Sequence, residues 1–122
     1  MTIDYTFGRD PHNGLKAKTI VSLGDDTRRE LHIETSKRTC GGIETNATVF
    51  TRTEDGQGLE HAFGLRRPGS GDYRSPLRRA DARCTEKAVR ALHESVTADN
   101  LHALLNEVRD YYVAQDAITG RV

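Results

Sequence analysis

The sequence has no long apolar run and few cysteines, and each absence excludes a class of protein. No stretch of the 122 residues approaches the ~20 apolar residues that a membrane-spanning helix needs. The segment Met1–Tyr5 has neither the basic residues nor the apolar run of a signal peptide, so we expect a cytoplasmic protein. Cys40 and Cys84 form no Cys-x-x-Cys pair, and in a reducing compartment we expect two buried thiols and no disulfide.

An excess of charge is also missing, because 18 Lys and Arg residues balance 18 Asp and Glu residues. A net charge of zero argues against a protein whose whole surface attracts nucleic acid or an anionic membrane. The balance is uneven along the chain, however. Residues 66–83 carry six Lys and Arg against two Asp and Glu, which is a local excess of four positive charges in a neutral protein.

Length and composition predict one globular domain over residues 1–122. A chain of this size buries roughly two thirds of the surface that it exposes when unfolded, so it needs no metal or disulfide framework to fold. Hydrophobic residues make up 35% of the chain and charged residues 30%, and the apolar residues recur at regular spacings, unlike those of a disordered chain.

The first half of the chain has the period-two pattern of strands. Residues 1–15 contain glycine, proline and asparagine among few apolar side chains and are expected to form an irregular arm, with a short strand at Thr2–Phe7 as the alternative left open. Four alternating runs follow, separated by turns rich in Gly and Asp, and they predict a four-stranded antiparallel β-meander over residues 16–67. His61 alternates with Leu59 and Phe63, so we expect it on the apolar face as a hydrogen-bonded core histidine and not as a catalytic base.

The second half has helical spacing. Ser75 and Pro76 resemble an N-cap followed by proline at the first helical position, and they predict a helix that ends near Val96. Thr97 then resembles the cap of a second helix. The two amphipathic helices are expected within residues 75–115, with a frayed tail at 116–122.

Packing both helices on the apolar face of the sheet gives an α+β fold with two layers. One core is expected to contain Leu31, Ile33, Val49, Phe63, Leu77, Leu92, Leu101, Leu105, Val108 and Tyr112.

The junction between sheet and helix is the one segment with a functional pattern. Arginine presents a planar fork of donors that suits phosphate, a helix N-terminus adds unpaired N–H groups, and a tyrosine can stack on a base. The candidate polyanion-binding residues are Arg66, Arg67, Tyr73, Arg74, Arg78, Arg79 and Arg83. Cations in the first turn of a helix oppose its dipole, which favours a role beyond folding. The simpler interpretation is that these arginines are solvated or form ion pairs.

No catalytic or metal-binding motif accompanies this junction. The five histidines share no ligand spacing such as His-x-x-x-His, and the glycines of the junction lack the order of a phosphate-binding Walker loop. The sequence therefore predicts no catalytic residue, no metal and no cofactor.

Two hypotheses of function follow. The first is a small non-enzymatic binding protein, homodimeric, that contacts DNA, RNA or another polyanion through the arginine-rich junction. The second is a protein–protein adaptor or inhibitor that binds no nucleic acid, in which the arginines meet an acidic protein surface. An enzyme ranks third, because no nucleophile–base pair or pair of carboxylates is visible. The homodimer is expected because a meander has two open edges, and because Phe50 and Ile20 lie on its polar face.

Overall fold

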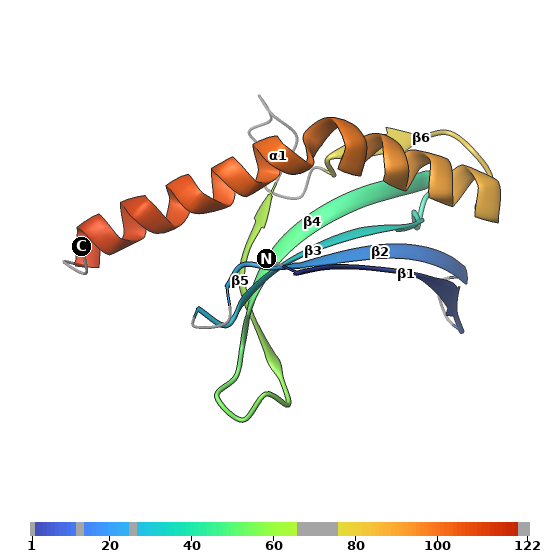
Figure 1. The fold of residues 1–122 in the computed structure, drawn as a ribbon. Helices are drawn as coiled ribbons and strands as arrows, with labels where there is room; N and C mark the ends of the chain where they lie inside the picture. The colour runs from blue at the N-terminus through green and yellow to red at the C-terminus, as the bar shows by residue number, and fades with distance from the viewer. Residues whose placement is uncertain (1, 12–13, 25–26, 66–75, 120–122) are drawn as a thin grey trace.

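The computed structural model describes residues 2–11, 14–24, 27–65 and 76–119, which form one antiparallel sheet with a long helix across one face (Figure 1). The elements in chain order are β1 (Thr2–Asp10), β2 (Gly14–Ser22), β3 (Arg29–Lys37), β4 (Ile43–Arg52), β5 (Leu59–Leu65), β6 (Arg78–Ala80) and α1 (Glu86–Thr119). The class is α+β, as expected. The expected count of four strands and two helices is wrong, because the described chain forms six strands and one helix.

The strands follow one another across the sheet in the order β1-β2-β3-β4-β5, and every neighbouring pair is antiparallel. The last strand, β6, lies off this path. It pairs with the start of β4, whereas β5 pairs with the rest of β4. Two short strands therefore share one edge of β4, and the free edge of the sheet on the opposite side is β1.

β1 occupies most of the segment expected to be an irregular arm. Ile3, Tyr5 and Phe7 point to one side and alternate with polar residues, which is the period of a strand. Gly8 lies within β1, Pro11 directly follows that strand, and Gly14 is the first residue of β2. Gly14 takes a φ of 78°, a conformation that favours glycine.

A single helix replaces the two that were expected. The segment assigned to the start of the first helix forms β6, and α1 begins only at Glu86, after Thr85 has capped it by accepting a hydrogen bond from the Ala88 amide at 3.2 Å. Thr97 does not start a second helix. Its hydroxyl donates to the carbonyl of His93, four residues earlier, so the threonine sits within a continuous helix. α1 then runs through to Thr119, into the segment expected to fray.

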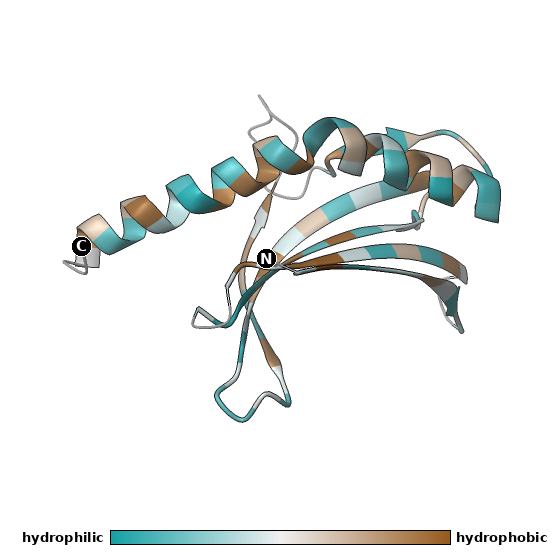
Figure 2. Cartoon of the chain, viewed as in Figure 1, coloured by the Kyte–Doolittle hydropathy of each residue, from teal (hydrophilic) through white to brown (hydrophobic). Residues whose placement is uncertain are grey.

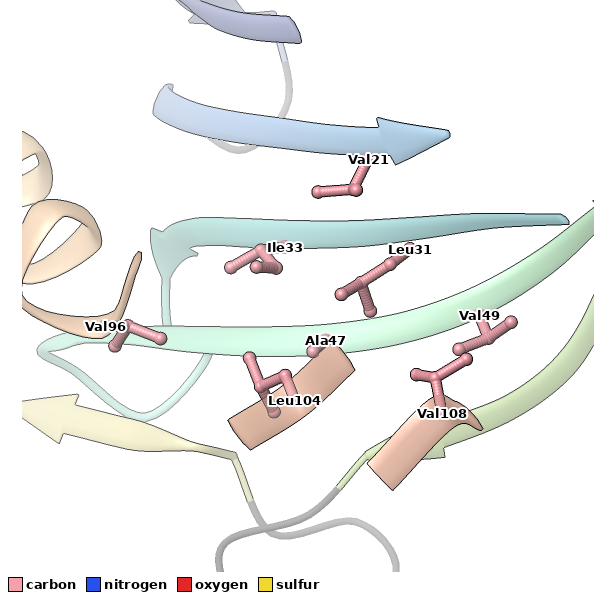
Figure 3. Close-up of a cluster of buried hydrophobic side chains, with 8 residues drawn as sticks. All are labelled: Val21, Leu31, Ile33, Ala47, Val49, Val96, Leu104 and Val108. Carbon is pink, nitrogen blue, oxygen red and sulfur yellow. The ribbon is translucent and has the colours of Figure 1, made fainter. Parts of the chain in front are cut away.

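The core lies between α1 and the inner face of the sheet. Figure 2 shows apolar residues alternating with polar ones along the strands and recurring at intervals along α1. The larger cluster joins β2, β3 and β4 to the helix (Figure 3) and contains Val21, Leu31, Ile33, Ala47, Val49, Val96, Leu104 and Val108. A second cluster near the start of α1 contains Ala17, Ile43, Val89 and Leu92. Leu92 thus departs from the expected single core, whose other nine members lie in or against the larger cluster.

A β-bulge in β5 overturns the expected place of His61. The register pairs Val49 with Phe63 but Phe50 with His61, so Ala62 is an extra residue in β5. Because one extra residue exchanges the two faces of a strand, Phe63 points to the core while His61 points outward, exposed, with its ring edge against Phe50. His61 is therefore not a core histidine.

Candidate functional site

Arg78 is bound to the helix. It lies opposite Thr45 in the register of β4 and β6, on the side of the sheet that faces α1. Its guanidinium donates to Ser95 Oγ at 2.8 Å and to Asn100 Oδ1 at 3.0 Å, and Asp99 lies 3.6 Å away. These interactions hold β6 to the middle of α1, so Arg78 has a structural role.

Arg79 points the opposite way. It lies opposite Glu44 on the outer face, because neighbouring residues of a strand point to opposite sides of the sheet. The side chain is exposed and makes no hydrogen bond or ion pair with another described residue. The expectation that Arg78 and Arg79 lie together in the first turn of a helix is wrong, since both belong to β6.

Arg83 lies in the approach to α1, where its side chain is exposed and makes no hydrogen bond or ion pair with another described residue. It precedes the capping residue Thr85 by two positions. The other candidates, Arg66, Arg67, Tyr73 and Arg74, lie outside the described residues and stay predictions.

Further cations that the sequence pattern did not single out lie at the same end of the sheet. Lys37 and Arg38 come at the end of β3, and Lys87 lies in the first turn of α1. Figure 1 shows this end, where the turn between β3 and β4, β6 and the start of α1 come together. Arg38 lies 3.5 Å from Glu44, the residue opposite Arg79. We call Lys37, Arg38, Arg79, Arg83 and Lys87 the basic end.

Nothing in the local sequence marks Lys37 and Lys87 as neighbours of the arginines. Only the topology brings the end of one strand, a hairpin turn and the start of the helix together. Thr85 caps that helix start, and Glu86 in its first turn pairs with Arg90 at 3.0 Å, so this carboxylate is already neutralised. The basic end therefore has more exposed cations than unpaired acids near the helix N-terminus.

A second polar feature is buried under α1. His93 is 1% exposed, and its ring reaches hydroxyl groups on two strands. Nε2 lies 2.7 Å from Thr19 Oγ1 on β2, and Nδ1 lies 2.8 Å from Thr35 Oγ1 on β3. Thr35 in turn lies 2.6 Å from Thr45 Oγ1 on β4. Burial lowers the pKa of His93 and Glu94 opposes this, so the imidazole is neutral in the fold.

This network links the helix to three strands. Neutral imidazole has one N–H donor and one acceptor nitrogen, and a hydroxyl can serve either, so both ring nitrogens are satisfied. A cavity of about 280 Å³ between β1 and α1 borders the ring and is lined by Tyr5, Thr19 and Leu101, among others. Thr35 occupies the place that a carboxylate has beside a catalytic histidine, and a hydroxyl does not stabilise an imidazolium in that way. The network is suited to structure more than to catalysis.

The outer face of the sheet carries an ion-paired cluster. Glu30 lies 2.8 Å from Arg52 and 2.9 Å from His32. Burial by itself raises the pKa of Glu30, but the hydrogen bonds from His32 and Arg52 outweigh it and hold this pKa below its usual value. Glu30 and Arg52 neutralise each other, so this pair leaves no net charge for a partner.

Comparison with known proteins gives no relative. The sequence matches no protein-family model and no curated protein, and the structure matches no solved structure. In the described part of the chain, no helix is long and apolar enough to cross a membrane. The same residues contain no group of three or more His, Cys, Asp or Glu placed to hold a metal ion.

Proposed function

We propose that the protein is a small non-enzymatic binding protein that contacts nucleic acid or another polyanion through the basic end. The observation that supports this best is that the side chains of Arg79 and Arg83 are exposed and make no hydrogen bond or ion pair with another described residue, in a protein of zero net charge. Arg66, Arg67, Tyr73 and Arg74 lie outside the described residues and stay candidates for the same binding role. Arg78 is removed from it, since its guanidinium is committed to α1.

The protein would bind phosphates and not base edges. Guanidinium groups bind phosphate with two parallel hydrogen bonds, whereas reading a sequence needs several side chains held in a groove by a helix or ribbon. The basic end draws single cations from a strand, a loop and the first turn of a helix. We therefore expect binding with weak sequence preference and a steep dependence on salt.

The test is a titration of fluorescently labelled duplex DNA and single-stranded RNA at two salt concentrations. The double variant R79Q/R83Q should bind more weakly, with a salt slope smaller by about one for each phosphate that the protein no longer neutralises. The control variant R109Q removes the charge of Arg109, an exposed arginine in the second half of α1, and should leave the salt slope unchanged. A double variant that binds like the wild type would refute the proposal.

R78Q provides a second control. It should lower the free energy of unfolding, because the hydrogen bonds to Ser95 and Asn100 are removed, while the folded protein still binds the same phosphates. If R78Q lowered the salt slope as the double variant R79Q/R83Q does, the assignment of Arg78 to the helix would be wrong.

The alternative proposal is a protein–protein adaptor or inhibitor without nucleic-acid binding. The observation that favours it is the uncovered edge of β1, which offers unpaired backbone groups to a partner strand. In that case the DNA and RNA titrations show no binding at either salt concentration. We further propose a homodimer in the cytoplasm, where Cys40 and Cys84 stay reduced. Both are free thiols in the structure, but Cys40 is exposed, so the expectation that both are buried is wrong.

A further inference from the structure

The edge of β1 lacks the features that protect sheet edges. β1 pairs with β2 over nine residues in unbroken register, and its other edge meets no described strand. Natural edge strands are shortened, bulged, or carry proline or lysine, which discourages pairing with another chain. Thr2–Gly8 has no proline, no bulge and one charged side chain, that of Asp4. β5, on the opposite side of the sheet, is shorter and contains the bulge at Ala62.

Two apolar side chains on this edge are uncovered. Ile3 is 50% exposed and Tyr5 is 44% exposed, although both point to the same side of the sheet as the core. Arg90 of α1 holds the aromatic residues of the strand, because its Nη1 donates to the Tyr5 hydroxyl at 3.1 Å and its guanidinium lies 4.0 Å over the Phe7 ring. The strand therefore presents ordered apolar side chains beside an open backbone edge.

We propose that this edge is covered by β1 of a second copy of the chain, antiparallel and centred on Tyr5. The two-fold axis would run through the sheet, between the two Tyr5 residues, and the two sheets would become continuous. Such an axis keeps both helices on the same face. Since directly opposed residues share a face, a residue and its partner must then both be odd-numbered or both even-numbered.

The sequence of β1 favours Tyr5 as the centre over the adjacent registers. With Tyr5 at the centre, Ile3 lies opposite Phe7 and Asp4 opposite Thr6, so apolar residues meet on one face and polar residues on the other. Centring on Asp4 places two carboxylates directly opposite each other, which is destabilising. Centring on Thr6 places Ile3 opposite Arg9. Of these three registers only the one centred on Tyr5 avoids both conflicts, and this self-complementarity favours a second copy as the occupant.

This inference rests on the homodimer part of the proposed function and is independent of anion binding. The test is sedimentation of the full chain at about 100 µM, where an interface of micromolar affinity is mostly occupied. The wild type should sediment at twice the 13.6 kDa of one chain. The variants Y5K and Y5D should each sediment as monomers, because like charges meet at the axis. Mixing the two should restore the dimer, since Lys and Asp are then opposed.

The matched control is L59K, which charges an exposed leucine on β5, the edge strand opposite β1, and should leave the dimer intact. A monomeric wild type would overturn both the dimer and its interface while leaving the anion titration unaffected. A dimer that persists in Y5K and Y5D would overturn this interface but keep a homodimer through another surface.

Disulfide trapping checks the register without relying on the charged variants. In a C40S/C84S background, Y5C should cross-link to itself under mild oxidation, because opposed residues of antiparallel strands lie within disulfide range. I3C alone should not cross-link, whereas a mixture of I3C and F7C should do so. Efficient self-linking of I3C would show a different register and would refute the centre on Tyr5.

Discussion

The buried hydrogen bonds of His93 lead to the sharpest prediction for stability. The perturbation is H93L, which replaces the imidazole with an apolar side chain of similar size under the helix and so removes both ring nitrogens. The bonds to Thr19 and Thr35 are removed at a site that is 1% exposed. Thr35 keeps its hydrogen bond to Thr45, but the Thr19 hydroxyl is deprived of the partner that the structure gives it.

The magnitude follows from these two changes. Each hydrogen bond contributes about 0.5–1.5 kcal/mol net, and a buried hydroxyl left without a partner costs about 1–3 kcal/mol. We expect H93L to lower the free energy of unfolding by about 2–4 kcal/mol. The double variant H93L/T19V also removes the Thr19 hydroxyl that H93L leaves without a partner. Its loss of stability should therefore be smaller than the sum of the losses in H93L and T19V by about 1–2 kcal/mol.

The same residue makes stability depend on pH. The pKa of His93 is lowered in the fold, whereas an unfolded histidine titrates near about 6.5. Below that pH the unfolded chain binds a proton that the folded chain does not, so the stability present above about pH 6.5 is lost as the pH falls toward the folded pKa. The slope for one proton is at most about 1.4 kcal/mol per pH unit. The other four histidines are present in both proteins, so the difference between wild type and H93L isolates His93.

The assay is urea denaturation followed by circular dichroism and tyrosine fluorescence, which the four tyrosines and the absence of tryptophan make suitable. Wild type and H93L are compared at pH values from about 5 to 7.5, which bracket the unfolded pKa. A loss of stability below about 0.5 kcal/mol, within the range of an ordinary surface substitution, would refute the network as a stabilising element. Equal pH slopes in both proteins would refute the neutral buried imidazole.

Two further pairs of substitutions test the packing around β6 and α1. G42A should lower the free energy of unfolding more than G56A does. Both glycines have positive φ, but a Cβ on Gly42 would lie 2.7 Å from the Ala80 carbonyl oxygen, whereas a Cβ on Gly56 would meet open space. Equal losses of stability in chemical denaturation would argue against this close approach. L104A should lower the free energy of unfolding by about 2–5 kcal/mol and L105A by less, because Leu104 is buried and Leu105 is only half-buried. The reverse order would show that α1 is rotated about its axis from its described position.

The faces of the central strands could be predicted from the sequence. Alternation alone places Leu31 and Ile33 inward and Glu30 and His32 outward, as the structure has them, because a strand with one buried face has a period of two. The same rule placed His61 on the wrong face. A bulge adds one residue and exchanges the faces beyond it, and no residue type at Ala62 marks it.

The helix boundaries were harder to predict because local and long-range signals disagree. Thr97 resembles a cap, yet the buried stripe from Val89 through Val96 and Leu104 to Val108 keeps a helical period across it. The continuous burial of that stripe against the sheet outweighs the weak local preference of one threonine. At the other boundary, the pattern around Arg78 fits a helix as well as a strand, and pairing with β4 decides for the strand.

The directions of the charged side chains also depend on pairing between distant segments of the chain. The arginine-rich segment was visible as composition, but the direction of each guanidinium depends on β6 being a strand. That element sends Arg78 to the helix and Arg79 to the outer face. Lys37 and Lys87 join Arg79 and Arg83 only through the topology, which no local pattern contains.

The order of elements along the chain has a consequence for folding during synthesis. The strands β1 to β5 pair with their neighbours in sequence, so the sheet can form by a series of local hairpins. α1 is the last element, and its interactions close much longer loops: His93 meets Thr35 across 58 residues and Thr19 across 74. While the ribosome is still making the helix, the inner face of a finished sheet has nothing over it. The nascent chain therefore passes through a stage with an exposed apolar sheet, when it is most prone to aggregate and most in need of a chaperone.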